Sequence, residues 1–191
     1  MNKNILVING NPKSESFCKV LASHYIKSSE QGNDVRLISI NSLEFDPNLN
    51  FGYSGEYALE PDLIYFQQSV AWAEHVVFIF PVWWGGMPAK LKGLIDRTFL
   101  PDFAFKYKSN NPMPEKLLKN KSADIILTMD AIPFYHRWIQ GDPVYRQLKR
   151  STLRFCGFNK VSATYIGSII NSSEKQRDNW VKQVARLAKK V

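Results

Sequence analysis

The chain has 191 residues, of which 45% are apolar, and it carries 25 basic against 17 acidic residues for a formal net charge of +8. This length suits one domain over residues 1–191, and the apolar fraction argues against disorder. The basic residues are scattered, which favours a solvated surface or attraction of small anions and argues against a nucleic-acid groove.

No stretch approaches the roughly 20 apolar residues that a membrane-spanning helix needs. Cys18 and Cys156 are the two cysteines, and no CxxC or Cys/His pair accompanies them. They therefore predict neither a disulfide framework nor a metal site. We expect a reduced, cytoplasmic protein.

Apolar, β-branched runs predict five strands along the chain. The first, third and fourth lack a polar face, as strands buried on both sides of a parallel sheet do. In chain order the runs are Ile5–Ile8, Asp34–Ile40, His75–Phe80, Ser122–Met129 and Lys160–Gly167.

Segments with helical spacing alternate with these strands. The alternation predicts βαβ units, so we expect an α/β three-layer sandwich around a doubly wound parallel sheet with helices on both faces. The expected helices cover residues 17–25, 62–73, 88–99 and 142–156, with a last one after Ser172–Glu174. The intervals 41–60 and 100–121 are long for idle connections and predict a cover over a site or a contact with a partner.

Ligands of open α/β sheets bind beyond the carboxyl ends of the strands. The first segment expected there is NGNPKSESFC, residues 9–18. Its turn, its hydroxyls and the helix start behind them favour a phosphate site, to which Lys13 adds charge. The alternative is that Ser16 is an ordinary helix cap.

The second segment is PVWWGGMP, residues 81–88. Aromatic faces beside glycine peptide units suit a flat heteroaromatic ligand with acceptor atoms along its edge. The alternative is that one tryptophan is core and the other lies in a dimer contact.

The third segment spans residues 129–141. Tyr135 or His136 is a candidate to donate a proton to a reduced product, and Arg137 is a candidate ligand for a carboxylate or phosphate. The alternative is an exposed histidine with no role.

The run FPVWWGGMPAKLKGLIDRTF, residues 80–99, is followed by DFAFKY, residues 102–107. Together with the first-loop sequence NPKSESFC, it resembles the flavodoxin-fold NAD(P)H dehydrogenase (quinone) family, which includes modulator-of-drug-activity and potassium-efflux ancillary proteins. The resemblance covers most of the chain. It implies a flavodoxin-like sheet with strand order 2-1-3-4-5.

The resemblance also implies a bound flavin, FAD by preference and FMN as the alternative. It assigns the flavin phosphate to Asn11, Ser16, Phe17 and Cys18. It assigns the isoalloxazine to Pro81, Val82, Trp83, Trp84 and Gly85, partly through backbone N–H groups. Gln67 matches a position near the adenine end of FAD.

The chain departs from the family pattern in two places. Cys18 stands where an asparagine is common in the family. Two interpretations are open: a small side chain tolerated beside the phosphate, or a redox-sensitive thiol. The stretch Thr128–Pro133 replaces a Thr-Thr-Gly-Gly type turn, so Met129 and Asp130 take the positions beside the pyrimidine ring. The proton-delivering pair of some members is assigned to Tyr135 and His136.

The activity implied is ping-pong hydride transfer from NAD(P)H through the flavin to a quinone or similar flat acceptor. The alternatives are a flavin-binding regulatory subunit of a membrane transporter and an FMN reductase or azoreductase. A one-electron carrier is disfavoured because such carriers are usually acidic. A homodimer is implied, with the 41–60 loop and DFAFKY at its interface and with Phe103 and Phe105 against the partner's flavin.

Overall fold

A five-stranded parallel sheet forms the centre of the protein, which a computed structural model describes over residues 2–50, 52–53, 58–109 and 111–191. The strand order is β2-β1-β3-β6-β7, and every neighbouring pair is parallel. Taken in order along the chain, these are the five predicted strands in the predicted order 2-1-3-4-5. Their bounds are β1 Asn4–Asn9, β2 Asp34–Ser39, β3 His75–Pro81, β6 Ser122–Thr128 and β7 Lys160–Ile166.

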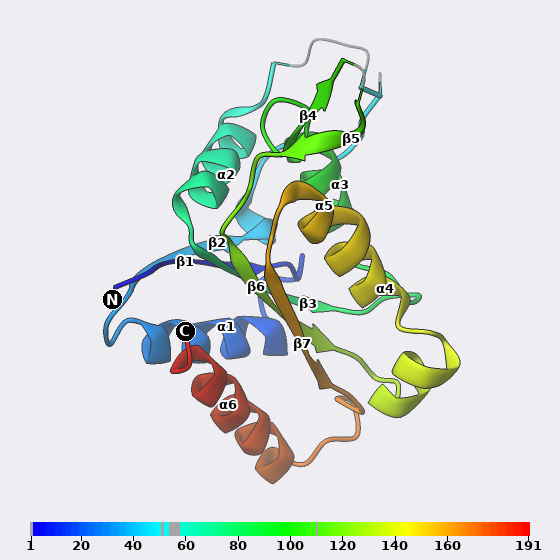
Figure 1. Cartoon of the computed structure of the whole chain (residues 1–191). Helices are drawn as coiled ribbons and strands as arrows, with labels where there is room; N and C mark the ends of the chain where they lie inside the picture. Colours follow the sequence, from blue (N-terminus) through cyan, green and yellow to red (C-terminus); the bar gives the residue numbers. More distant parts are fainter. Residues whose placement is uncertain (1, 51, 54–57, 110) are drawn as a thin grey trace.

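Helices cover both faces of this sheet (Figure 1). On one face, α1 (Phe17–Ser29) and α6 (Glu174–Ala188) pack beside each other and share one apolar cluster with the sheet. The other face carries most of the remaining helices in a second apolar cluster. They are α2 Pro61–Trp72, α3 Ala89–Thr98, α4 Pro143–Arg146, the π-helical η3 Gln147–Leu153 and α5 Arg154–Cys156.

Burial explains why the central strands read as continuous apolar runs. All seven residues of β3 are buried, because β3 lies between β1 and β6 and both of its faces are covered by helices. Strand β2 lies at the edge of the sheet and is mostly half-buried or exposed, which matches its partly alternating sequence.

Two serine caps fix where the helices of the first face begin. The Ser16 hydroxyl accepts a hydrogen bond from the Lys19 amide at the start of α1. Ser173 and Gln176 form a capping box at the start of α6. Such caps satisfy amides that have no partner within the helix.

The two long intervals, residues 41–60 and 100–121, contact the rest of the protein in different ways. In the first, the buried Arg97 donates to Glu60 Oε2 at 2.7 Å and to the carbonyl oxygen of Asp46. Residues 51 and 54–57 of the predicted 41–60 dimer loop lie outside the described residues.

The second interval forms an antiparallel hairpin of β4 (Phe105–Lys108) and β5 (Asn111–Lys116), which was not predicted. Phe105 is 7% exposed, and its ring lies 5.1 Å from that of Phe155 on α5. Phe103 is half-buried against Phe99. The prediction that Phe105 walls a partner's flavin is wrong, because the ring is buried in its own chain.

Within the described ranges, no helix is both long and apolar enough to pass through a membrane.

Candidate functional site

A cavity of about 320 Å³ opens at the carboxyl ends of β1, β3, β6 and β7. It brings together most of the cofactor-binding residues predicted from the sequence, in three segments that are distant along the chain. These residues are Asn11, Ser16, Phe17, Cys18, Pro81, Val82, Trp83, Met129 and Asp130. Lys13, Glu15, Thr128, Ile169 and Ile170 also line it.

The loop after β1 is shaped by side-chain amides. The Asn9 side chain accepts from the Asn11 amide at 3.3 Å, and the Asn11 side chain accepts from the Lys13 amide at 3.0 Å. These bonds turn the chain so that the N-terminus of α1 faces the cavity. Ser16 both caps α1 and lines the cavity, so its role as a cap does not exclude the predicted phosphate contact, and its hydroxyl hydrogen is available to a ligand.

Cys18 lies on the floor of the cavity and is 2% exposed. Its Sγ is 3.3 Å from the Thr128 hydroxyl oxygen at the end of β6. Burial raises the pKa of the thiol above its usual value, and hydrogen bonds with Thr128 and Asn11 offset only part of that rise. A thiol kept protonated is a poor nucleophile, so the small-side-chain interpretation of Cys18 fits and the redox-sensitive one does not.

The two tryptophans stand at a tight turn after β3. Trp84 has φ +50° and Gly85 has φ +73°, and the amides of Trp83 and Gly86 each donate to the other's carbonyl at 2.9 Å. This is the geometry of a two-residue turn with both central residues left-handed. Trp83 is 43% exposed and lines the cavity, whereas Trp84 is fully exposed beyond its mouth.

That turn changes which backbone donors face a ligand. The Val82 amide donates to Thr128 O at 2.7 Å and the Trp83 amide is bonded within the turn. These two amides are therefore already bonded within the chain, while the prediction that residues 81–85 line the flavin ring, partly through backbone N–H groups, stays a prediction. The amides of Trp84 and Gly85 make no recorded hydrogen bond to another described residue, which leaves them as donors beside the cavity mouth.

The loops after β6 and β7 form one packed unit. Asp130 accepts a hydrogen bond from the Ile170 amide at 3.2 Å, and the Met129 amide donates to Ile166 O at 2.9 Å. A Cβ at Gly167 would lie 2.4 Å from Pro133 Cδ, so only glycine permits this approach. The unit adds the apolar Ile169 and Ile170 to the cavity wall, which the sequence analysis missed.

Tyr135 and His136 lie on the π-helical η2 (Tyr135–Ile139) and do not line the cavity. Tyr135 is 49% exposed. His136 is 1% exposed, so the expectation of an exposed loop histidine is wrong. Its Nδ1 is 3.1 Å from Gln140 Oε1, and its Nε2 is 3.5 Å from Asp142 Oδ1.

Gln67 lies away from this cavity, half-buried on α2. Its side-chain amide donates to Thr98 O, at the end of α3, over 2.8 Å. This contact gives Gln67 a structural role, and its predicted position near the adenine of FAD stays a prediction.

A helix N-terminus and apolar walls in one cavity, with the Trp84 and Gly85 amides beside its mouth, suit a flat ring that carries a phosphate. A sequence family described as having a flavodoxin-like fold matches residues 3–191. The chain belongs to this family.

Individual members of the flavodoxin-like family give the comparison more detail. The chain is 28% identical over 218 residues to the Mus musculus protein named ribosyldihydronicotinamide dehydrogenase (quinone), covering 99% of this chain and 92% of that protein. It is 31% identical over 113 residues to FMN-dependent NADH:quinone oxidoreductase 2 of Listeria monocytogenes, covering 56% and 49%. The crystal structure of Smu.1420 from Streptococcus mutans superposes with a TM-score of 0.85 at 32% identity, covering 98% and 99%.

Proposed function

We propose that the protein is a flavin-dependent NAD(P)H oxidoreductase that reduces a quinone or a similar flat acceptor. The observation that carries the proposal is the cavity in which the N-terminus of α1, with Phe17, lies beside Val82 and Trp83. Relatives named as quinone dehydrogenases support it, and one of them matches almost the whole chain.

The residues present fit a flavin. The first amides of the 13-residue helix α1, together with Ser16 and Lys13, would hold the phosphate, since a helix N-terminus favours anions. Val82, Trp83 and Ile169 would hold the ring by apolar contact. When bound, the flavin would supply hydride exchange between nicotinamide and acceptor.

The chain's own contribution is binding and orientation. Trp84 stands fully exposed beside the cavity mouth and offers a face for a flat acceptor or nicotinamide. The Trp84 and Gly85 amides are placed to donate to acceptor atoms at a ring edge. Tyr135, which is 49% exposed on η2 outside the cavity lining, is the remaining candidate for proton transfer. The buried His136 positions η2 through Gln140 and Asp142.

Among flavins, we propose FMN as the bound form. The sequence favoured FAD, with Gln67 at its adenine end, but the Gln67 side chain is bonded to Thr98 O outside the cavity. The Listeria relative is named FMN-dependent. A phosphate at α1 and a ring beside Trp83 are the two ends of FMN, and neither needs a site for an adenosine.

We also propose that two copies of the chain associate through an apolar surface beside the cavity. Large apolar side chains that are 63–74% exposed gather on the loops after β6 and β7, and single-chain proteins rarely expose such patches without a partner. They are Ile132, Phe134, Ile139 and Ile170.

Steady-state kinetics test the proposed activity. We expect the purified protein to oxidise NADPH or NADH only when flavin and a quinone such as 1,4-benzoquinone are present. Varying both substrates should give parallel double-reciprocal lines, because the nucleotide leaves before the quinone binds. A flavin-loaded protein that oxidises neither nucleotide would overturn the proposal.

A further inference from the structure

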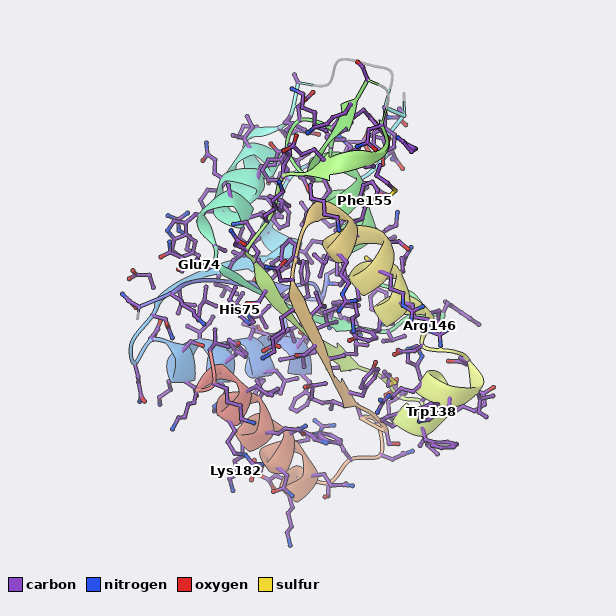
Figure 2. All side chains as sticks on the ribbon, viewed as in Figure 1. Glu74, His75, Trp138, Arg146, Phe155 and Lys182 are labelled. Carbon is purple, nitrogen blue, oxygen red and sulfur yellow. The ribbon has the colours of Figure 1, made fainter. Side chains whose placement is uncertain are left out.

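A second cavity, of about 210 Å³, lies beside η2 and α4 and is lined mainly by cations. Figure 2 shows Trp138 of η2 and Arg146 of α4 on the same side of the molecule. We call this cavity the cation pocket and define it by Arg137, Trp138, Asp142, Arg146, Lys149 and Arg150, with Tyr145 on its floor.

The four cations of the cation pocket are not neutralised by the acids around them. Among the described residues, none of the four is in an ion pair. Asp142, the one acid in the lining, accepts from the Tyr165 hydroxyl and lies 3.5 Å from His136 Nε2. Its two oxygens are thus directed to neighbours other than the arginines.

Aromatic rings hold two of these cations in place. The Arg137 guanidinium lies 4.6 Å from the centre of the Tyr165 ring, and Lys149 Nζ donates to the Tyr145 hydroxyl at 2.8 Å. Arg146 and Arg150 remain exposed at the opening. Four like charges around one small cavity repel each other, and an anionic ligand between them would remove that repulsion.

The cation pocket adjoins the turn at the mouth of the flavin cavity. A Cβ at Gly85 would lie 3.4 Å from the Pro143 ring, and Pro143 follows Asp142 of the cation pocket. With about 210 Å³ the pocket falls below the roughly 300–1,000 Å³ of a complete small-molecule site. It is sized for one end of a ligand whose other end lies at Trp83 and Trp84.

We propose that the cation pocket binds the 2′-phosphate on the adenosine of NADPH, and that the enzyme thereby selects NADPH over NADH. The inference rests on the proposed nicotinamide oxidoreductase activity. Planar guanidinium groups of Arg146 and Arg150 match phosphate oxygens with paired hydrogen bonds. Trp138, which is 68% exposed, offers its face to the adenine.

A double variant with Arg146→Gln and Arg150→Gln tests the assignment, because both side chains are exposed and the change removes two charges. Lys182→Gln on α6 together with Lys189→Gln at its C-cap is the matched control: it lowers the net charge equally on the opposite face of the sheet. We expect the arginine variant to lower the ratio of kcat/KM for NADPH to that for NADH by about 10- to 100-fold, the effect of losing charge-assisted hydrogen bonds. The lysine control should leave that ratio within about 2-fold. An unchanged ratio in the arginine variant would overturn the inference.

A binding measurement separates this inference from the proposed activity. Isothermal titration with 2′,5′-ADP and with 5′-AMP should show tighter binding of 2′,5′-ADP to the wild-type protein, and the arginine variant should lose the difference. Equal binding of the two nucleotides to the wild type would overturn the 2′-phosphate site. A wild-type protein that oxidises neither NADPH nor NADH would instead refute the proposed activity, while the titration still decides the cation pocket.

Discussion

Trp84 gives the sharpest mutational prediction, because it adopts a backbone conformation that disfavours its side chain. It has φ +50° and is fully exposed. A non-glycine residue in the left-handed region costs about 1–2 kcal/mol. Strain of this kind gathers at functional sites, and Trp84 stands at the mouth of the proposed flavin cavity.

The change Trp84→Gly should therefore leave the stability of the flavin-free protein unchanged or slightly higher. It removes about 1–2 kcal/mol of strain, and the greater backbone freedom of glycine in the unfolded chain offsets about 0.5–1 kcal/mol. The net gain is about 0–1.5 kcal/mol. At roughly 2–4 °C per kcal/mol for a chain of this size, Tm should rise by no more than about 6 °C.

Activity should change in the opposite direction. Without the indole face beside the cavity mouth, we expect kcat/KM for the quinone to fall by about tenfold, the scale of one aromatic stacking contact with its buried area. Trp84→Asn is the control, since asparagine tolerates a positive φ but lacks the ring, and it should show the same loss. Calorimetry on the flavin-free protein and steady-state kinetics on the loaded one measure the two effects. A clear drop in Tm with unchanged kcat/KM would refute the reasoning.

Three further predictions concern packing, pH and thiols. Gly167→Ala should lower Tm and weaken flavin binding, because overpacking costs about 1–3 kcal/mol and displaces the loop after β6. Gly32→Ala is the control, because the space around Gly32 is open. Equal changes of Tm in the two variants would contradict the prediction. Hydrogen bonds from His75 and Ser162 hold the pKa of Asp124 below its usual value although burial opposes them. Above the ordinary pKa of about 3.9, ionised Asp124 therefore stabilises the folded protein, and this stabilisation is lost as the pH falls through the lower pKa of the folded state. The difference in unfolding free energy between wild type and Asp124→Asn should shrink over that pH range. Denaturant titrations that show a constant difference would argue against the prediction. Both cysteines are buried, and burial raises the pKa of each thiol. A thiol reagent should therefore label the native protein slowly and the unfolded protein at once. Rapid labelling of the native protein would show an accessible thiolate and contradict the prediction.

The sheet was predictable because its strands are buried on both faces. Continuous apolar runs such as His75–Phe80 have few alternatives in a chain of alternating strands and helices, and the strand order followed from the family resemblance. The hairpin β4–β5 was not predictable from pattern. Residues 111–116, NPMPEK, contain two prolines and few apolar residues, which argue against a strand unless it pairs only at an edge.

The sequence predicted where in the fold the candidate site lies, but it did not predict the backbone conformation and burial of all of its residues. The strand-end rule brought together the loops after β1, β3 and β6, and the same rule applied to β7 would have found Ile169 and Ile170. The glycines after β3 indicated a tight turn but not that its central residues are Trp84 and Gly85, because such turns usually begin with asparagine, aspartate or glycine and not with tryptophan. The burial of His136 depends on Asp142 and Gln140 folding around it, which spacing along the chain does not reveal.

The visible spectrum of the purified protein, with chromatography of the flavin released on denaturation, tests the central claim most directly. The account predicts flavin absorption bands and release of FMN, with the bands bleached by NADPH under anaerobic conditions and restored by a quinone. A colourless protein that takes up neither FMN nor FAD on titration would contradict it.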